Sequence, residues 1–340
     1  MAERAPGQRE RRRTWSSLGN LSRKPNDYEI VTHDMNHTMG NKPLDMGPDV
    51  HGNVWLKKYR NDIPLKVSDW NKFRDPDRVT YDSYVKMQDE QETYIDNLLI
   101  SYTKDNSIDE RLSSDCLNLL AEAFTPCRYL VHAQQMISAY IYQLAPSSYV
   151  GNCAAFQVAD QLRRVQRTAY RTKQLDNAHP AHSFGSRERG VWEKEPHWQS
   201  IRKAMERLLV VFEWDQALIA NNLVIRPICD DLFLNQLAKA VRATGDELDA
   251  LILENLYHDS SRHNRWTVAL AKFVIEENSA NRGELRRIAS KWEAASEEII
   301  RAGSELISGC VPGLSAEAIA QDVRRNSAQL HSQAGHGLDA

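Results

Sequence analysis

Cysteine and long apolar runs are scarce in this sequence. Only five of the 340 residues are cysteine, and no two of them form a Cys-x-x-Cys pair. This spacing excludes the usual structural zinc site and favours reduced thiols over a disulfide framework. No stretch approaches the roughly 20 apolar residues of a membrane span, since even residues 208–228 are interrupted by charged and amide side chains. We therefore expect a soluble protein of the cytoplasm.

An excess of charge of one sign is also missing. The chain has 43 Lys and Arg against 46 Asp and Glu, which gives a formal net charge of −3. A surface of mixed sign does not produce the field that attracts nucleic acid or an anionic membrane. Neither partner is expected.

The motifs of a self-contained active site are absent as well. There is no nucleophile elbow, glycine-rich phosphate loop or His-Glu-x-x-His segment. None of the eleven histidines has a glutamate three residues upstream. That spacing is how a helix of a di-iron bundle presents a carboxylate and an imidazole on one face. The sequence therefore offers no complete metal or catalytic site.

Proline and glycine separate an irregular arm from the rest of the chain. Residues 1–76 contain six of the twelve prolines, so no long helix can run through them. A short strand is predicted at residues 28–32. Five aromatic side chains of the arm need a dry environment, either on the chain's own domain or on another subunit; they are Trp15, Tyr28, Trp55, Tyr59 and Trp70.

After the arm, apolar residues recur at helical spacing almost to the end of the chain. The predicted helices cover about residues 84–102, 107–140, 153–175, 196–212, 218–225, 244–273, 282–307 and 315–330. Capping-box signatures, Ser107 with Glu110 and Thr244 with Glu247, are predicted to start two of them. The pattern predicts an all-α domain behind an extended arm.

Two similar motifs lie 99 residues apart inside these helices: Asp160-Gln161-Leu162-Arg163-Arg164 and Asp259-Ser260-Ser261-Arg262-His263. An aspartate and a basic side chain four residues later share one face of a helix. If that face is buried, we expect Asp160 to pair with Arg164, and Asp259 with His263, because a lone buried carboxylate is costly. Two ordinary solvated helix faces are the alternative.

Several longer segments occur in an order that is typical of one family. They are Arg13-Thr14-Trp15, Lys24-Pro25, Tyr28-Glu29-Ile30-Val31, Gln88-Asp89-Glu90-Gln91-Glu92, Thr168-Ala169-Tyr170-Arg171, Trp192-Glu193-Lys194-Glu195-Pro196, Asn222-Leu223-Val224 and Arg262-His263-Asn264-Arg265-Trp266. With them the chain resembles, over residues 13–307, the β subunit of the hydroxylase component of soluble bacterial di-iron monooxygenases. The toluene, alkene and isoprene branch is the most similar.

The resemblance implies a ferritin-like, ribonucleotide-reductase-like bundle with extra C-terminal helices. In the family's catalytic α subunit, Asp-Glu-x-Arg-His occurs twice and binds two irons. Here Asp160 and Asp259 match the aspartate, but other positions depart from the motif: Gln161 and Ser260 replace the glutamates, Arg164 replaces one histidine, and only His263 is kept. The resemblance therefore implies a degenerate iron site, with no metal and no catalytic residue in this chain.

The family also implies partners. The chain would be a non-catalytic β subunit of an (αβγ)2 hydroxylase whose α subunit holds the di-iron centre, with a small γ subunit. An effector protein and a Rieske-type ferredoxin would act on the complex, and other components would use NADH, FAD and a 2Fe-2S cluster. The complex would oxidise an alkene such as isoprene or an aromatic such as toluene.

In this interpretation residues 1–76 wrap a partner subunit, so the five arm aromatics become candidate interface residues. Residues 77–310 form the ferritin-like domain without a metal site, and residues 311–340 form a C-terminal helix with a frayed tail. Two alternatives remain: a ferritin-like protein with its own di-iron centre, and an unrelated helical adaptor.

Overall fold

The structure is a computed structural model that describes residues 18, 21, 23–35, 49–103 and 108–335. Its long helices are α3 (Tyr81–Thr103), α5 (Cys127–Leu144), α6 (Ser148–Ala178), α8 (Pro196–Leu208), α12 (Glu247–Glu277), α14 (Glu293–Cys310) and α15 (Ala316–Gln333). The shorter ones are α1 (Asp27–Thr32), α2 (His51–Leu56), α4 (Ser114–Leu119), α7 (Glu188–Lys194), α9 (Trp214–Leu218), α10 (Arg226–Asp230), α11 (Leu237–Ala243) and α13 (Asn281–Ser290). No strand occurs among these residues, so the all-α prediction is confirmed.

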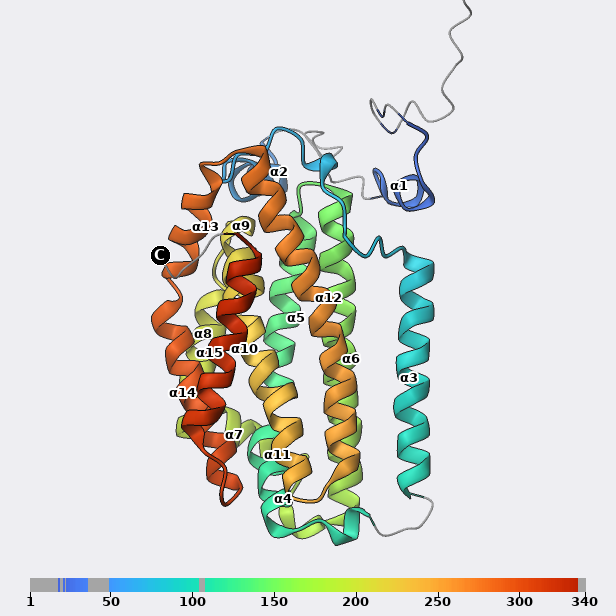
Figure 1. Cartoon of the computed structure of the whole chain (residues 1–340), viewed down its shortest axis with the longest axis vertical. Helices are drawn as coiled ribbons and strands as arrows, with labels where there is room; N and C mark the ends of the chain where they lie inside the picture. Colours follow the sequence, from blue (N-terminus) through green and yellow to red (C-terminus); the bar gives the residue numbers. More distant parts are fainter. Residues whose placement is uncertain (1–17, 19–20, 22, 36–48, 104–107, 336–340) are drawn as a thin grey trace, which may run out of the picture.

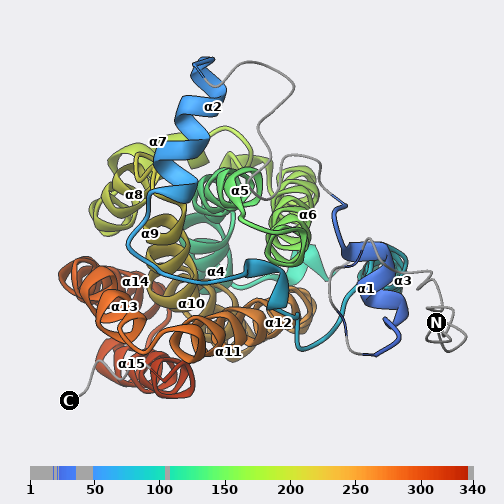
Figure 2. The same cartoon turned by 90° about the horizontal axis from the view of Figure 1, so that it is seen from above.

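The long helices stand side by side as an upright bundle (Figure 1). At its centre, α9, α10 and α11 join through two π-helical segments, η7 (Ile219–Ile225) and η8 (Asp231–Gln236), into one continuous buried rod. Pro227 lies at the start of α10 and has no N–H to donate, which fits the widened turns on either side of it. Around this rod, α5, α6 and α12 cover one side, and α8, α14 and α15 cover the other (Figure 2).

Two predicted helices are divided in the structure. The 107–140 pattern becomes α4, the π-helical η5 (Leu120–Phe124) and α5, whereas the 282–307 pattern becomes α13 and α14, separated near Trp292. A helical apolar pattern continues through such breaks because both pieces bury the same side. None of the described helices is long and apolar enough to cross a membrane.

Both helices start at other residues than the sequence predicts. Ser107 lies outside the described residues, and α4 begins instead at Ser113, whose Oγ accepts a hydrogen bond from the Cys116 backbone at 3.2 Å. At α12 the N-cap is Asp246, whose Oδ1 accepts from the backbone N–H of Asp249 at 3.2 Å. Aspartate and threonine both cap helices effectively, so residue type alone does not choose between Asp246 and Thr244. Asp246 directly precedes α12 and takes the N-cap position.

The predicted strand at residues 28–32 is also wrong, because this segment forms α1. Asn26 and Glu29 make a reciprocal capping box, with each side chain accepting from the other's backbone N–H at 2.9 and 3.0 Å. The buried Glu29 carboxylate also accepts from Arg23 at 2.9 Å and from Arg74 at 3.0 Å. The β-branched pair Ile30-Val31 favours a strand, but these local hydrogen bonds stabilise the helix.

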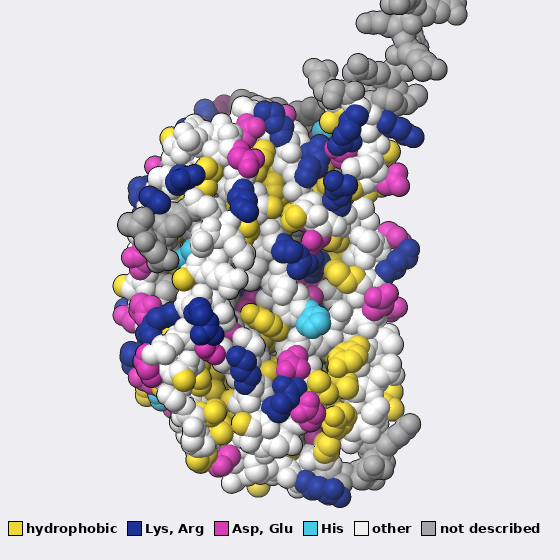
Figure 3. Space-filling view, viewed as in Figure 1, with side chains coloured by type: hydrophobic (Ala, Val, Ile, Leu, Met, Phe, Trp, Pro, Cys, Tyr) yellow, Lys and Arg dark blue, Asp and Glu magenta, His cyan; other side chains and the backbone are white. Residues whose placement is uncertain are grey.

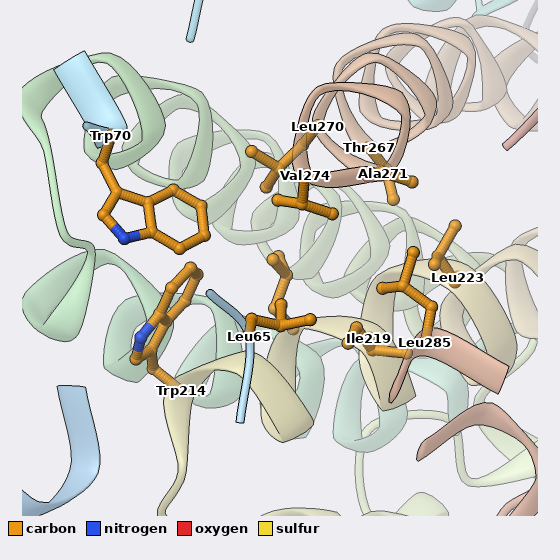
Figure 4. Close-up of a pocket in the computed structure, with 11 residues that line it drawn as sticks. Leu65, Trp70, Trp214, Ile219, Leu223, Thr267, Leu270, Ala271, Val274 and Leu285 are labelled. Carbon is orange, nitrogen blue, oxygen red and sulfur yellow. The ribbon is translucent and has the colours of Figure 1, made fainter. Parts of the chain in front are cut away.

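The described aromatic residues of the arm pack on the chain's own helices. Tyr28 is 5% exposed and its ring lies 5.8 Å from that of Tyr149 in α6. Trp70 packs edge-on against Trp214 at 5.2 Å, beside a small apolar cavity that also receives Leu65 from the arm (Figure 4). The expectation that Tyr28 anchors in a partner is therefore corrected, since the chain's own core buries its ring. Trp70 is half-buried, and its contact with a partner stays a prediction.

Two further arm aromatics are half-buried. The Trp55 and Tyr59 rings contact Phe212 at 5.2 and 5.6 Å, and the Trp55 indole donates to the Tyr140 hydroxyl of α5 at 3.0 Å. Trp15 lies outside the described residues. Wrapping of a partner by residues 1–76 stays a prediction.

Candidate functional site

The two sequence motifs meet at the centre of the bundle, where α6 and α12 lie side by side. Ser147 caps the start of α6 and Asp246 the start of α12, and each motif lies near the middle of its 31-residue helix. Asp160, Asp259 and His263 are all 5% exposed or less. The alternative of two ordinary solvated helix faces is therefore wrong.

The acidic and basic groups pair across the two helices. Asp160 on α6 accepts from Arg262 and from His263 Nε2 (2.6 Å), both on α12. In the opposite direction, Arg163 on α6 donates to Asp259 on α12 at 3.1 Å. Each motif thus supplies an aspartate to the other motif's arginine.

The intrahelical pairing predicted from the spacing is therefore wrong. Neither Asp160 with Arg164 nor Asp259 with His263 makes a direct ion pair. The i, i+4 rule describes side chains on a free helix surface, whereas here the neighbouring helix lies within reach of the long arginine side chains.

Helix α3 closes the outer side of this network. The Gln88 amide donates to Asp160 at 2.8 Å and to Asp259 at 3.1 Å, which links the two aspartates. Tyr84 donates to Asp160 at 2.9 Å, and Glu92 accepts from Arg163 at 2.6 Å. Sequence reasoning missed these residues as network members, although Gln88 and Glu92 begin and end one of the family segments.

Arg164 points inward to the central rod. It donates to Asp230 of α10 at 2.7 Å and to Ser260 of α12 at 2.7 Å. Arg226 donates to the second oxygen of Asp230 at 2.8 Å, and Ser260 donates to that oxygen at 2.9 Å. Sequence reasoning also missed Asp230; its signal is the i, i+4 spacing to Arg226 inside an otherwise apolar segment.

Burial and the arginines set the protonation of these groups in different ways. Burial acts to raise the pKa of Asp230, but the guanidinium groups of Arg164 and Arg226 outweigh it and lower the pKa below its usual value. At Asp160 burial outweighs the nearby arginines and raises the pKa. Burial, reinforced by the arginines, holds the pKa of His263 well below its usual range, so this imidazole is neutral and donates from Nε2.

These side chains do not fit a di-iron centre. Such a centre needs about four carboxylates and two imidazoles directed at one point. Here the Arg164 cation takes an imidazole position, and the buried amide of Gln161 makes no hydrogen bond. Among the described residues, no group of three or more His, Cys, Asp and Glu side chains is placed to hold a metal ion. The geometry is that of an internal ion-pair network.

Comparison with known proteins gives a consistent family. The family described as Methane/Phenol/Alkene Hydroxylase matches residues 55–278. The β subunit of the toluene-4-monooxygenase hydroxylase component from Ectopseudomonas mendocina is 36% identical over 298 residues, which cover 87% of this chain and 90% of the relative. The small subunit of the propane 2-monooxygenase hydroxylase component from Gordonia sp. (strain TY-5) is 26% identical over 48% of this chain and 45% of its own length.

Solved structures agree with these sequence relatives. A chain of toluene 4-monooxygenase, solved with toluene in its resting active site, superposes with a TM-score of 0.82 at 34% identity, covering 91% of this chain and 100% of the other. A chain of xenon-pressurised phenol hydroxylase from Pseudomonas sp. OX1 gives a TM-score of 0.83 and covers 98% of both chains. At 19% identity, this second likeness concerns the fold alone.

Proposed function

The chain belongs to the methane/phenol/alkene hydroxylase family, as a β subunit of a soluble di-iron monooxygenase, and on this basis we propose that it is a non-catalytic scaffold for a larger, iron-bearing subunit. Its helices supply a rigid, self-contained body, and the oxidation takes place in the partner.

The observation that carries this proposal is the buried contact of Arg164 with Asp230 and Ser260. A guanidinium remains charged under all physiological conditions. A cation at this position repels a metal ion and already occupies the carboxylate that could bind one. The network is then a structural replacement for a metal centre, because it joins α6, α10 and α12 where iron would otherwise bridge them.

The partners follow from the family. We propose an (αβγ)2 hydroxylase in which this chain contacts a catalytic α subunit, with residues 1–76 contributing to the contact, and in which a small γ subunit is present. The di-iron centre belongs to the α subunit. An effector and a Rieske-type ferredoxin act on the assembled complex, and the associated components carry NADH, FAD and 2Fe-2S chemistry.

For the substrate we propose a small hydrocarbon, either an alkene such as isoprene or an aromatic such as toluene. The support is the 36% identity to the toluene-4-monooxygenase β subunit. No described residue of this chain is assigned a contact with the substrate.

Metal analysis tests the scaffold role. The full chain, expressed alone, is expected to purify without stoichiometric iron and without oxygen-dependent activity, whereas co-expression with the larger subunit gives an iron-containing, active complex. The matched control is the larger subunit expressed alone under the same iron supply. Two irons per molecule of the isolated chain, with turnover, would overturn the proposal in favour of a self-sufficient di-iron protein.

A further inference from the structure

One face of the bundle carries almost no charge. Residues 131–144 of α5 and 148–159 of α6 contain no Asp, Glu, Lys or Arg, although such residues make up 26% of the chain. The next three charged residues of α6, Asp160, Arg163 and Arg164, are buried toward α3, α12 and the central rod. The first largely exposed charge of this helix is Lys173, near its C-terminal end. Along residues 131–144 and 148–166, the outer side of the α5–α6 hairpin therefore carries no exposed Asp, Glu, Lys or Arg.

These side chains recur every three or four residues along both helices, so they form two adjacent stripes. We call this surface the uncharged face and define it by Met136, Ala139, Val158, Ala159, Leu162 and Tyr170. Met136, Leu162 and Tyr170 are 41%, 44% and 55% exposed. In Figure 2, α5 and α6 lie side by side on the opposite side of the bundle from α15.

The face that carries α12 and α15 is different. Figure 3 shows Lys, Arg, Asp and Glu side chains spread over it, with apolar side chains scattered between them. Such mixing is normal for a solvated surface, whereas depletion of charge over a contiguous face is typical of the centre of a protein–protein interface.

The uncharged face continues upward into the aromatic cluster of Trp55, Tyr59, Tyr140 and Phe212. Helix α2 projects beyond α5 at this end (Figure 2), and Val54 on it is 49% exposed. Aromatic rings held by their neighbours lose little entropy on binding and make strong interface anchors. Small side chains below them, such as Ala139 and Ala159, allow another helix to approach closely.

We propose that the uncharged face of α5 and α6, with this aromatic cluster at its upper end, is the surface on which the larger hydroxylase subunit docks an apolar, uncharged helical face. This inference rests on the proposed function, because the relatives include a hydroxylase "small subunit", a term that requires a larger one.

The test inserts single negative charges into the face of the full chain. Met136→Glu and Leu162→Glu are expected to weaken binding to the larger subunit by at least about tenfold, because a charge buried in an apolar interface costs more than about 1.4 kcal/mol. Val85→Glu is the matched control: this α3 residue is 45% exposed and outside the face, and its binding should change less than about twofold. Binding is measured by sedimentation with the purified larger subunit.

Each outcome decides one point. If the wild-type chain does not bind the larger subunit, the proposed function fails; if it binds and both variants bind equally well, only the assigned surface is wrong. A wild-type homodimer dispersed by Leu162→Glu would assign the face to a second copy of the chain and overturn the proposal. If Met136→Glu or Leu162→Glu lowers the thermal stability of the chain, the binding measurement is repeated with Gln166→Glu. This change adds a charge on the exposed side of α6 without changing the size of the side chain.

Discussion

Arg262 of α12 donates a hydrogen bond to Asp160 of α6 and lies 4.0 Å from Asp259, the carboxylate three residues earlier on its own helix, so its closer partner is on the neighbouring helix. The reverse contact, from Arg163 to Asp259, makes the arrangement reciprocal. Two such contacts fix the register of α6 against α12, since a shift of one helix along the other would break both. A buried ion pair adds little net stability by itself, but removing one partner leaves an uncompensated charge.

A double-mutant cycle on this pair measures its coupling. Asp160→Asn is expected to lower the free energy of unfolding by about 3 kcal/mol, because Arg262 loses its buried counter-charge. Arg262→Gln in the Asp160→Asn background should cost much less than in the wild type, with a coupling of about 1–3 kcal/mol. Chemical denaturation supplies the four values.

The matched control for this cycle is the exposed pair of Lys86 and Asp82 on α3, whose side chains are 72% and 77% exposed. Asp82→Asn should change stability by less than about 1 kcal/mol. Additive effects of Asp160→Asn and Arg262→Gln would contradict the assigned contact.

The attachment of α3 depends on polar contacts. Gln88→Ala removes the bridge between Asp160 and Asp259, and Glu92→Gln removes the α3 carboxylate that pairs with Arg163. Both changes should speed amide hydrogen exchange in α3 while leaving α5 unaffected, because local opening reports on local contacts. Glu90→Gln, at an exposed position of the same helix, is the control and should leave the exchange rates unchanged.

Asp246 gives the stability a specific pH dependence. Burial, with the neighbouring Asp249 charge, raises the pKa of Asp246 to about 8, whereas an aspartate in the unfolded chain titrates near about 3.9. The folded protein therefore holds this proton more tightly, so the contribution of Asp246 to the free energy of unfolding is full below about pH 4 and is lost as pH rises to about 8.

Asp246→Asn tests this dependence and keeps a side chain that can cap α12. The variant is expected to lose less stability than the wild type between pH 4 and pH 8, with each unit of pKa difference contributing about 1.4 kcal/mol. Parallel stability curves for the two proteins, measured by urea denaturation across this range, would show that Asp246 is ionised throughout.

Gly303 in α14 marks a close approach to the central rod. A Cβ added there would lie 2.8 Å from a methyl group of the buried Leu232. We expect Gly303→Ala to destabilise the protein by about 1–3 kcal/mol through overpacking. Gly283→Ala in α13 meets no atom within 4 Å and should instead be neutral or stabilise by up to about 1 kcal/mol through helix propensity. Thermal unfolding compares the two, and equal shifts would count against tight α14 packing.

The sequence by itself determined the helical class, the position of most long helices and the presence of two equivalent motifs. Apolar periodicity is a local property, so it is readable without a fold. The sequence also showed which metal-ligand positions of the family motif are replaced, because Gln161, Arg164 and Ser260 stand where the motif has glutamate or histidine. Local rules were less successful where two signals competed, as at residues 28–32, where β-branched side chains obscured the capping box of Asn26 and Glu29.

Only the tertiary structure decided the partners of the buried charges. Asp160 and Arg262 are 102 residues apart, and Asp230 joins Arg164 from a third helix. Spacing along one helix cannot state which neighbouring helix lies within reach of a long side chain. The same holds for Tyr28, whose aromatic character indicates a dry environment, while the packing of the arm determines that the chain's own core provides it.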